Sequence, residues 1–214
     1  MLMKKNWKFF TMKNLFIILF SVSVPFLILL DNTKQAIVYE GYENILNETG
    51  AFDRVDNVKE INSQIVGFII GTNQEFSALT PREKKHMEDV RWVVANGYAV
   101  YLILMLVAFV SFFVIITKYG FDTASNALMI AAVVSLSKLI LLSMIDFSAL
   151  FTFIHGLIFE QGSWLFSSSD LLIRLYSFEF FRQISMKIAS ATAIQAVVLF
   201  VFGFMFKGVE KRIF

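Results

Sequence analysis

The chain has 214 residues, enough for one ordinary domain, but its composition excludes an ordinary soluble domain. Apolar residues make up 57% and charged residues 17%, and phenylalanine alone occurs 25 times. A soluble globule of this size cannot hide so much apolar surface from water. The net charge of +2 argues against nucleic-acid binding. The absence of cysteine excludes disulfides, thiolate metal sites and an acyl-cysteine intermediate.

Four stretches are long and apolar enough to cross a bilayer. We expect these spans at about residues 14–30, 97–117, 121–145 and 184–206. The first is interpreted as a retained anchor rather than a cleaved signal peptide, because no small-x-small cleavage site follows it. The sequence therefore predicts an all-α integral membrane protein with four transmembrane helices, forming a single membrane domain over residues 1–214.

Lysine and arginine in the short connections set the predicted orientation. They gather before the first span, between the second and third spans, and after the fourth: Lys4, Lys5, Lys8, Lys13, Lys118, Lys207, Lys211 and Arg212. Both termini are therefore expected in the cytoplasm, with the chain crossing the plasma membrane several times. Residues 31–96 and 146–183 are expected to form extracytoplasmic segments, in which acids outnumber bases.

The first extracytoplasmic segment is predicted to be helical. Val58–Ile70 is amphipathic, and Gly71 breaks the pattern. Thr80, Pro81 and Glu83 then form a capping box, which predicts a helix that starts at Pro81 and continues into the second span.

That second helix carries one of the two histidines of the chain, His86. Asp89 follows three residues later on the same face. A carboxylate at this spacing can orient an imidazole ring and raise its basicity, but the same pattern is also typical of a solvated charged face. The spacing alone leaves both interpretations open.

The second extracytoplasmic segment is rich in Phe and Leu, yet it is broken by glycine and serine. We expect its apolar faces to lie in the membrane interface, with Trp164 at the headgroup level. Ser169 or Asp170 is expected to cap a short helix that contains Leu171, Leu172 and Leu175. The other histidine, His155, lies here in apolar surroundings, where a lone histidine is more often structural than catalytic.

Two cations near the membrane permit more than one interpretation. Lys138 lies inside the third span, which is costly unless it extends outward to the interface or faces a polar cavity. Arg174 either pairs with a neighbour or contacts lipid headgroups.

Two motifs resemble those of a known family. Glu83 followed by His86-Met87-Glu88-Asp89-Val90-Arg91 resembles the first signature of the lipoprotein intramolecular transacylase (Lit) family, whose members are small bacterial membrane proteins with four spans. A second, more diffuse signature corresponds to His155, Phe159, Trp164 and the run Asp170-Leu171-Leu172-Ile173. The resemblance covers essentially the whole chain, including the number of spans and the place of each histidine. The chain departs from the family in lacking a proline before Phe180-Phe181.

The resemblance implies an acyltransferase. It would move an acyl chain, expected to be the sn-2 chain, from the diacylglyceryl group of a membrane lipoprotein to the α-amine of the lipoprotein's N-terminal cysteine. The product would be a lyso-form lipoprotein, no cofactor is implied, and the active site is expected at the outer leaflet.

The resemblance also implies roles for individual residues. We expect His86, held by Asp89 or another carboxylate such as Glu83, to be the base, and His155 to be the acid or oxyanion donor, although the two roles can be exchanged. Substrate or lipid contacts are expected from Arg91, Lys138, Trp164 and Arg174.

Other function classes compete with this interpretation. A non-catalytic membrane module that binds lipid or a partner predicts that the two histidines are dispensable and lie far apart. A metalloenzyme would need both histidines and a carboxylate, but the usual short-spaced ligand pair is missing, so no metal is expected. A channel or transporter is disfavoured because the spans contain one interior charge and no paired half-helices. The sequence leaves the oligomeric state open.

Overall fold

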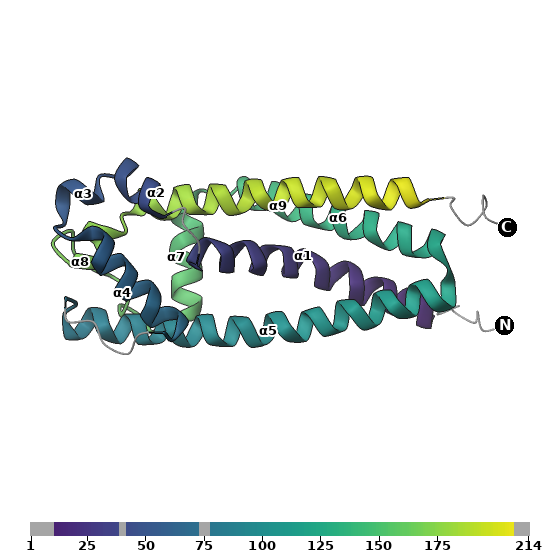
Figure 1. Ribbon diagram of the computed structural model, residues 1–214, viewed down its shortest axis with the longest axis horizontal. Helices are drawn as coiled ribbons and strands as arrows, with labels where there is room; N and C mark the ends of the chain where they lie inside the picture. The colour runs from purple at the N-terminus through teal and green to yellow at the C-terminus, as the bar shows by residue number, and fades with distance from the viewer. Residues whose placement is uncertain (1–10, 39–41, 73–77, 208–214) are drawn as a thin grey trace, which may run out of the picture. The chain divides into compact units, whose positions relative to one another are not determined.

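The computed structural model describes residues 11–38, 42–72 and 78–207. Within these ranges the chain forms nine helices and no strand (Figure 1). The helices are α1 Met12–Val38, α2 Tyr42–Glu48, α3 Ala51–Arg54, α4 Val58–Ile70, α5 Pro81–Tyr119, α6 Phe121–Ser143, α7 Phe147–Ile158, α8 Leu171–Leu175 and α9 Phe178–Phe206.

Four of these helices, α1, α5, α6 and α9, are long and apolar enough to cross a membrane, which confirms the predicted fold class. Helix α5 has 39 residues, about twice the number that a bilayer requires. It begins at Pro81, as the capping box predicts, and its charged first part precedes the predicted span at 97–117. The predicted span at 97–117 lies within this helix, and the placement of its first turns outside the membrane stays a prediction.

The described residues form two compact units. The spanning unit comprises residues 11–29, 101–140 and 192–207. The pocket unit comprises the described residues within 30–100 together with residues 141–191. The prediction of a single membrane domain over residues 1–214 stays a prediction.

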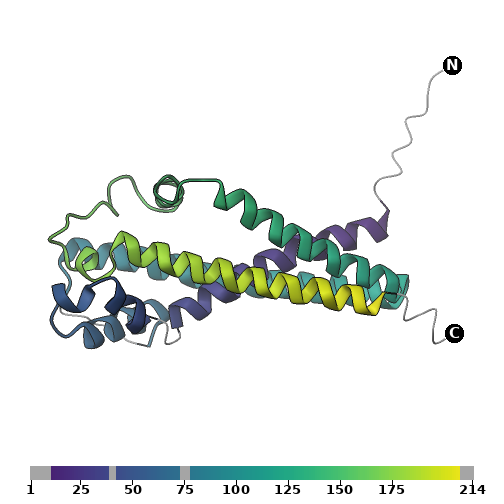
Figure 2. The same cartoon turned by 90° about the horizontal axis from the view of Figure 1, so that it is seen from above.

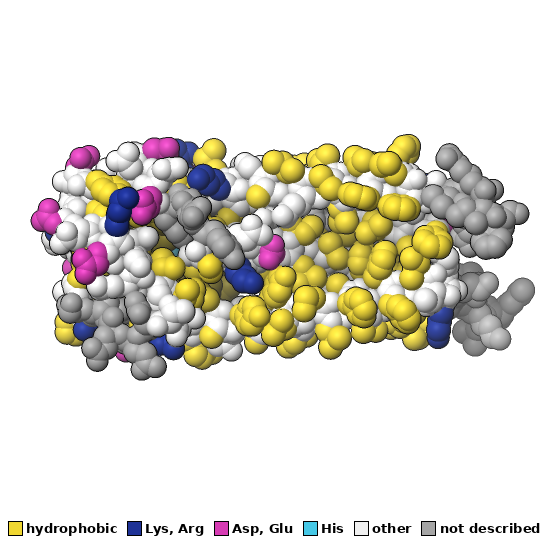
Figure 3. Space-filling model, viewed as in Figure 1, with side chains coloured by type: hydrophobic (Ala, Val, Ile, Leu, Met, Phe, Trp, Pro, Cys, Tyr) yellow, Lys and Arg dark blue, Asp and Glu magenta, His cyan; other side chains and the backbone are white. Residues whose placement is uncertain are grey.

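Small side chains on α6 build the core of the spanning unit. The buried residues of this helix are Thr123, Ala124, Ser125, Ala127, Ala131, Ala132 and Ser135. Such residues let neighbouring backbones approach closely. The hydroxyl of Ser21 on α1 donates to the carbonyl oxygen of Ala127 at 3.3 Å. Many large apolar side chains of this unit are exposed, as expected for a surface that faces lipid (Figure 3).

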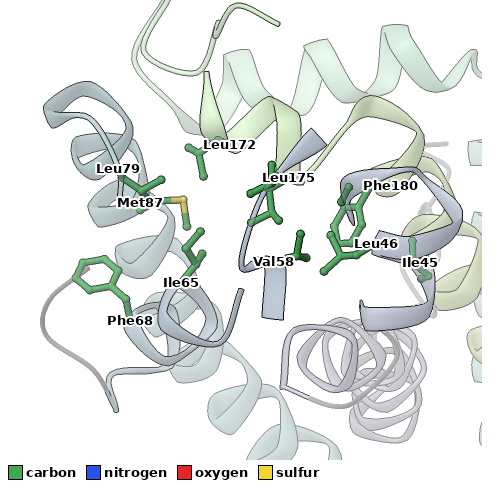
Figure 4. Close-up of a cluster of buried hydrophobic side chains, with 12 residues drawn as sticks. Ile45, Leu46, Val58, Ile65, Phe68, Leu79, Met87, Leu172, Leu175 and Phe180 are labelled. Carbon is green, nitrogen blue, oxygen red and sulfur yellow. The ribbon is translucent and has the colours of Figure 1, made fainter. Parts of the chain in front are cut away.

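A cluster of buried apolar side chains forms the core of the pocket unit (Figure 4). Its labelled members are Ile45, Leu46, Val58, Ile65, Phe68, Leu79, Met87, Leu172, Leu175 and Phe180. The predicted amphipathic helix Val58–Ile70 is confirmed as α4, and its buried face contributes three of these residues. Gly71 ends α4 with φ of 84°, a left-handed conformation that glycine adopts without steric cost.

The segment between α6 and α9 contains short helices, as the sequence predicts. Asp146 caps α7 by accepting a hydrogen bond from the backbone N–H of Ala149 at 3.1 Å. Asp170 occupies the N-cap position of α8. Residues 159–170, which we name the cavity loop, connect α7 to α8 through turns and irregular backbone (Figure 2).

Candidate functional site

The pocket unit encloses a cavity of about 470 Å³. Residues of α4, α5, α7, the cavity loop and the start of α9 line it, and most of them are apolar. The polar or titratable side chains in the lining are His86, His155, Trp164, Asn62 and Tyr176. A largely apolar cavity with a few convergent polar groups is the usual form of a small-molecule or lipid site.

His86 lies on α5, in the turn after Glu83. Its ring lies 4.9 Å from the ring of Phe159 and 5.4 Å from that of Phe166, measured between centroids. Its Nδ1 atom is buried and has no hydrogen-bond partner among the described residues. Burial, assisted by the nearby His155, lowers the pKa of His86 to about 4, while the charge of Asp89 opposes the shift.

His155 lies on α7 and has a defined hydrogen bond. Its Nδ1 atom lies 2.8 Å from the carbonyl oxygen of Phe151. Because a carbonyl oxygen only accepts, Nδ1 carries the proton and donates it, so Nε2 of the neutral ring holds a lone pair. Burial lowers the pKa of His155, and the hydrogen bond to Phe151 partly opposes this. The His155 ring stacks on that of Phe151 at 3.9 Å and contacts Trp164 at 5.0 Å.

The fold brings the two histidines to the same cavity. Both rings contact the ring of Phe159, at 4.9 Å from His86 and 5.5 Å from His155. The non-catalytic interpretation predicts the opposite arrangement, with the two histidines far apart.

The two acids expected to support the histidines have other partners. Asp89 accepts a hydrogen bond from Lys85 Nζ at 3.1 Å, so the expected hydrogen bond that would hold the His86 ring is replaced by an ion pair along the helix. Glu83 is 1% exposed. Its Oε2 accepts from the backbone N–H and hydroxyl of Thr80, at 2.9 and 2.7 Å, and its Oε1 accepts from the backbone N–H of Leu172 at 2.9 Å. Glu83 therefore ties the turn before His86 to the start of α8.

Of the four residues expected to contact lipid or substrate, the structure places one, Trp164, on the cavity. The guanidinium of Arg91 lies over the ring of Phe68 at 5.1 Å. Arg174 donates to the carbonyl oxygen of Arg54. Both cations thus have partners away from the cavity lining.

Lys138 belongs to the spanning unit rather than to the pocket unit. Its Nζ donates to the carbonyl oxygen of Pro25 at 2.9 Å and lies 5.3 Å from the ring centroid of Phe26. The lysine is half-buried against α1 and lies outside the cavity lining, and its extension to the membrane interface stays a prediction.

Sequence reasoning missed three residues around the cavity. The hydroxyl of Tyr176 donates to Asn62 Oδ1 at 2.7 Å, and both side chains line the cavity. Asn62 interrupts the apolar face of α4, a signal that was available in the sequence. Arg82 donates to the carbonyl oxygens of Gly162 and Leu165 in the cavity loop, and no sequence pattern marks that pairing.

The described part of the chain contains no cluster of side chains suited to metal binding. Across the described residues, no group of three or more His, Cys, Asp or Glu side chains is placed to hold a metal ion.

A family model described as lipoprotein intramolecular transacylase Lit matches residues 8–181 of the chain. The chain belongs to this family. The resemblance found in its two sequence motifs is thereby confirmed, and the protein is a multi-pass membrane protein.

Solved structures show the same fold. The in meso structure of the membrane integral lipoprotein intramolecular transacylase Lit from Bacillus cereus, in a form with a histidine-to-arginine mutation, has a TM-score of 0.75 at 14% identity. That match covers 94% of each chain. A second in meso structure of the Bacillus cereus protein has a TM-score of 0.73 at 16% identity, covering 95% of this chain and 99% of that chain.

One further relative is more similar in sequence. An uncharacterized protein of Aquifex aeolicus (strain VF5) is 28% identical over 131 residues, which are 60% of this chain and 54% of that protein. The chain thus spans about half the length of this relative.

Proposed function

We propose that this protein is a lipoprotein intramolecular transacylase. It moves an acyl chain, the sn-2 chain in our proposal, from the diacylglyceryl group of a membrane lipoprotein to the α-amine of the N-terminal cysteine. The observation that carries the proposal is the meeting of His86 and His155 on one apolar cavity, in a chain of this family. The apolar lining suits acyl chains, and a neutral imidazole offers one ring nitrogen as an acceptor and the other as an N–H donor.

The reaction makes modest demands on the protein. The amine and the ester belong to one molecule, so the cavity mainly has to hold them in an attack geometry. The α-amine has an ordinary pKa of about 8, so a weak base is sufficient to remove its proton. No covalent intermediate with the enzyme is needed, which is consistent with the absence of cysteine.

We assign the base to His155. Its Nδ1–H is held by the carbonyl of Phe151, which leaves the Nε2 lone pair free to accept a proton. As the N–C bond forms, Nε2 takes a proton from the attacking amine. As the C–O bond breaks, Nε2 gives that proton to the departing glycerol oxygen, so the charge balance of the protein is restored. Proton transfer of this kind contributes roughly 10²–10⁴-fold to the rate.

We assign a donor role to His86. A proton on its buried Nδ1 would be an N–H without an acceptor, which is rarer in proteins than an unmatched acceptor. The proton of the neutral ring therefore belongs on Nε2, and a pKa of about 4 keeps the ring neutral. Nε2–H then donates to the oxygen that becomes negative in the tetrahedral intermediate. This reverses the roles that we favour from sequence alone.

The proposed location is the plasma membrane, with both termini in the cytoplasm and the cavity at the outer leaflet. Within the spanning unit, the start of α1, the connection between α5 and α6, and the end of α9 lie at the same end (Figure 1). Lys13, Lys118 and Lys207 are at these positions, which supports a cytoplasmic assignment for this end. The other basic residues used for the orientation lie in 1–10 and 208–214, outside the described residues.

The proposal is tested by mass spectrometry of one bacterial lipoprotein. The lipoprotein is produced with and without this protein in a host that lacks its own N-acylating enzymes, and fragmentation locates each acyl chain. We expect an N-acyl, monoacylglyceryl product, and its loss in His86→Ala and His155→Ala. The exposed Lys59→Ala on α4 is the matched control and should retain full activity.

Two outcomes would contradict the proposal. An unchanged diacylglyceryl form with a free amine, despite confirmed membrane expression, favours the non-catalytic lipid- or partner-binding module. Full activity in His155→Ala would remove the base assignment while leaving the transacylase activity in place.

A further inference from the structure

The indole nitrogen of Trp164 is a buried donor without an acceptor. Trp164 lies in the cavity loop and lines the cavity, and its Nε1 has no hydrogen-bond partner among the described residues. An indole N–H can only donate, and about 90% or more of buried polar groups in proteins have a partner. Four buried side-chain nitrogen or oxygen atoms lack a partner in the described chain, and two of them, Trp164 Nε1 and His86 Nδ1, belong to residues that line this cavity.

This donor lies beside the proposed base. The centroid of the Trp164 ring is 5.0 Å from that of His155 and 6.4 Å from that of Phe151, whose carbonyl fixes the His155 tautomer. The indole therefore belongs to the same aromatic cluster that positions the imidazole. A substrate group that reaches His155 Nε2 also comes close to the Trp164 ring.

The backbone on both sides of Trp164 is held in place from α5. Arg82 donates to the carbonyl oxygens of Gly162 and Leu165, and its guanidinium lies 5.0 Å from the ring centroid of Phe166. A side chain on an irregular loop is a precise donor only when the loop itself is fixed. The contacts of Arg82 supply that restraint.

We propose that Trp164 Nε1–H donates a hydrogen bond to the carbonyl oxygen of the ester under attack. It thus forms a second donor next to His86 Nε2–H. This role rests on the proposed function, because it needs an oxygen that gains negative charge in the cavity. Trp164 transfers no proton: its hydrogen bond strengthens as the carbonyl becomes an oxyanion and weakens when the new amide forms.

The first test is the kinetics of Trp164→Phe, which keeps an aromatic ring and removes the N–H. With a diacylglyceryl peptide as substrate, we expect kcat to fall by about 10²-fold or more while KM changes little. Trp92→Phe is the matched control, because Trp92 is exposed on α5 and is absent from the cavity lining. Wild-type kcat in a folded Trp164→Phe would overturn the proposal.

A second measurement observes the donor directly and does not depend on that variant folding. The chain has three tryptophans, so a protein labelled with ¹⁵N at tryptophan gives three indole N–H signals. On addition of a phosphonate analogue of the tetrahedral intermediate, we expect the Trp164 indole proton to move downfield and that of Trp92 to stay. A Trp164 signal that does not move while the analogue inhibits the enzyme would overturn the proposal.

Different experimental outcomes would contradict the transacylase function and the donor role of Trp164. Absence of product with wild-type protein counts against the transacylase function itself. Normal product formation together with a silent Trp164 signal, or an active Trp164→Phe, counts against the donor role alone. An analogue that does not bind the wild-type protein contradicts both.

Discussion

The two imidazoles are chemically distinct although both are half-buried on one cavity. His155 has a backbone carbonyl partner at Nδ1, and Nδ1 of His86 has no partner in the part of the chain that the structure describes. Desolvation lowers the pKa of both rings, because a buried charge loses its hydration. The two rings therefore differ in hydrogen bonding rather than in burial. The bond at Nδ1 makes Nε2 of His155 an acceptor, whereas the lack of one among the described residues makes Nε2–H of His86 a donor.

The protonation of His86 can be followed by NMR. In detergent micelles, we expect the ring signals of His86 to titrate with a midpoint near pH 4, because Phe159 and Phe166 exclude water from the ring. Phe159→Ala should admit water and move the midpoint toward 6.5, while Phe202→Ala in the spanning unit should leave it unchanged. A wild-type midpoint near 6.5 would contradict the desolvated site.

The same shift has a consequence for folding stability. The unfolded chain binds a proton at His86 near pH 6.5 and the folded chain near pH 4. Between these values the unfolded state binds more protons, so this residue lowers the free energy of unfolding as the pH falls through the window. Above about pH 6.5 the contribution is absent, because both states hold a neutral ring.

At the scale of secondary-structure elements, Glu83 joins two helices that are distant in sequence. Its carboxylate completes the capping box of α5 and also accepts from the N–H of Leu172 at the start of α8. Replacing a buried carboxylate that accepts several hydrogen bonds lowers the free energy of unfolding. Each N–H that loses its acceptor stays buried away from water and has no partner.

Replacing Glu83 tests this link. Glu83→Gln keeps the size of the side chain but puts an amide NH₂ against a backbone or hydroxyl donor. We expect the free energy of unfolding to fall by about 2 kcal/mol, measured by thermal or denaturant unfolding in micelles. Glu88→Gln, an exposed acid on the same helix, should change it by less than about 0.5 kcal/mol. Equal effects of the two substitutions would show that the buried link contributes little.

Helix α9 approaches α6 closely at Gly203. A Cβ at this position would lie 2.9 Å from the carbonyl oxygen of Ser125 and 2.9 Å from Met129 Cγ. The backbone oxygen cannot turn away as a flexible side chain can. The small residues of α6 and the glycine of α9 thus act as a pair that sets the spacing of the two helices.

Gly203→Ala should therefore destabilise the spanning unit. We expect a loss of about 1–3 kcal/mol, because the added methyl group forces the two helices apart. Gly97→Ala on α5 is the matched control, since a Cβ there has no atom within 4 Å. It should be neutral or stabilising by up to about 1 kcal/mol. Unfolding of both variants in micelles compares them, and a neutral Gly203→Ala would show that the contact relaxes freely.

On the scale of the whole molecule, the orientation in the membrane is open to a direct test. The chain contains no cysteine, so single cysteines can be introduced without a background signal. Cysteine at Glu88, on the part of α5 that we propose to be extracytoplasmic, should react with a membrane-impermeant maleimide in intact cells. Cysteine at Lys118, at the other end of the helix, should react only after permeabilisation. The reverse pattern would invert the proposed topology.

Much of the fold is predictable because its signals are local. The capping box at Thr80 and the glycine break at Gly71 set the ends of α5 and α4, and both lie where they are predicted. The four spans are found from apolar length alone, since a helix that crosses lipid must satisfy its own backbone. Helix α9 begins at Phe178, before the predicted span at 184–206, and its first turns pack in the pocket unit.

The hydrogen-bond and ion-pair partners of individual side chains are harder to predict from the sequence than the helix ends are. Asp89 has the right spacing to support His86, yet it pairs with Lys85, and the second partner of Glu83 lies on α8. Nothing in local spacing selects between such partners, since a long side chain reaches several groups. Asp89 has its partner on the same helix, whereas Glu83 accepts from a backbone N–H that the packing of α8 brings to it.

The sequence by itself determined the four apolar spans, the helical class, the family motifs and the two histidines, because composition and short-range periodicity carry that information. The tertiary structure decided that His86 and His155 share one cavity, and that the indole of Trp164 has no acceptor among the described residues. These facts depend on contacts between segments distant along the chain. Such contacts are set by burial and hydrogen-bond matching in the folded state.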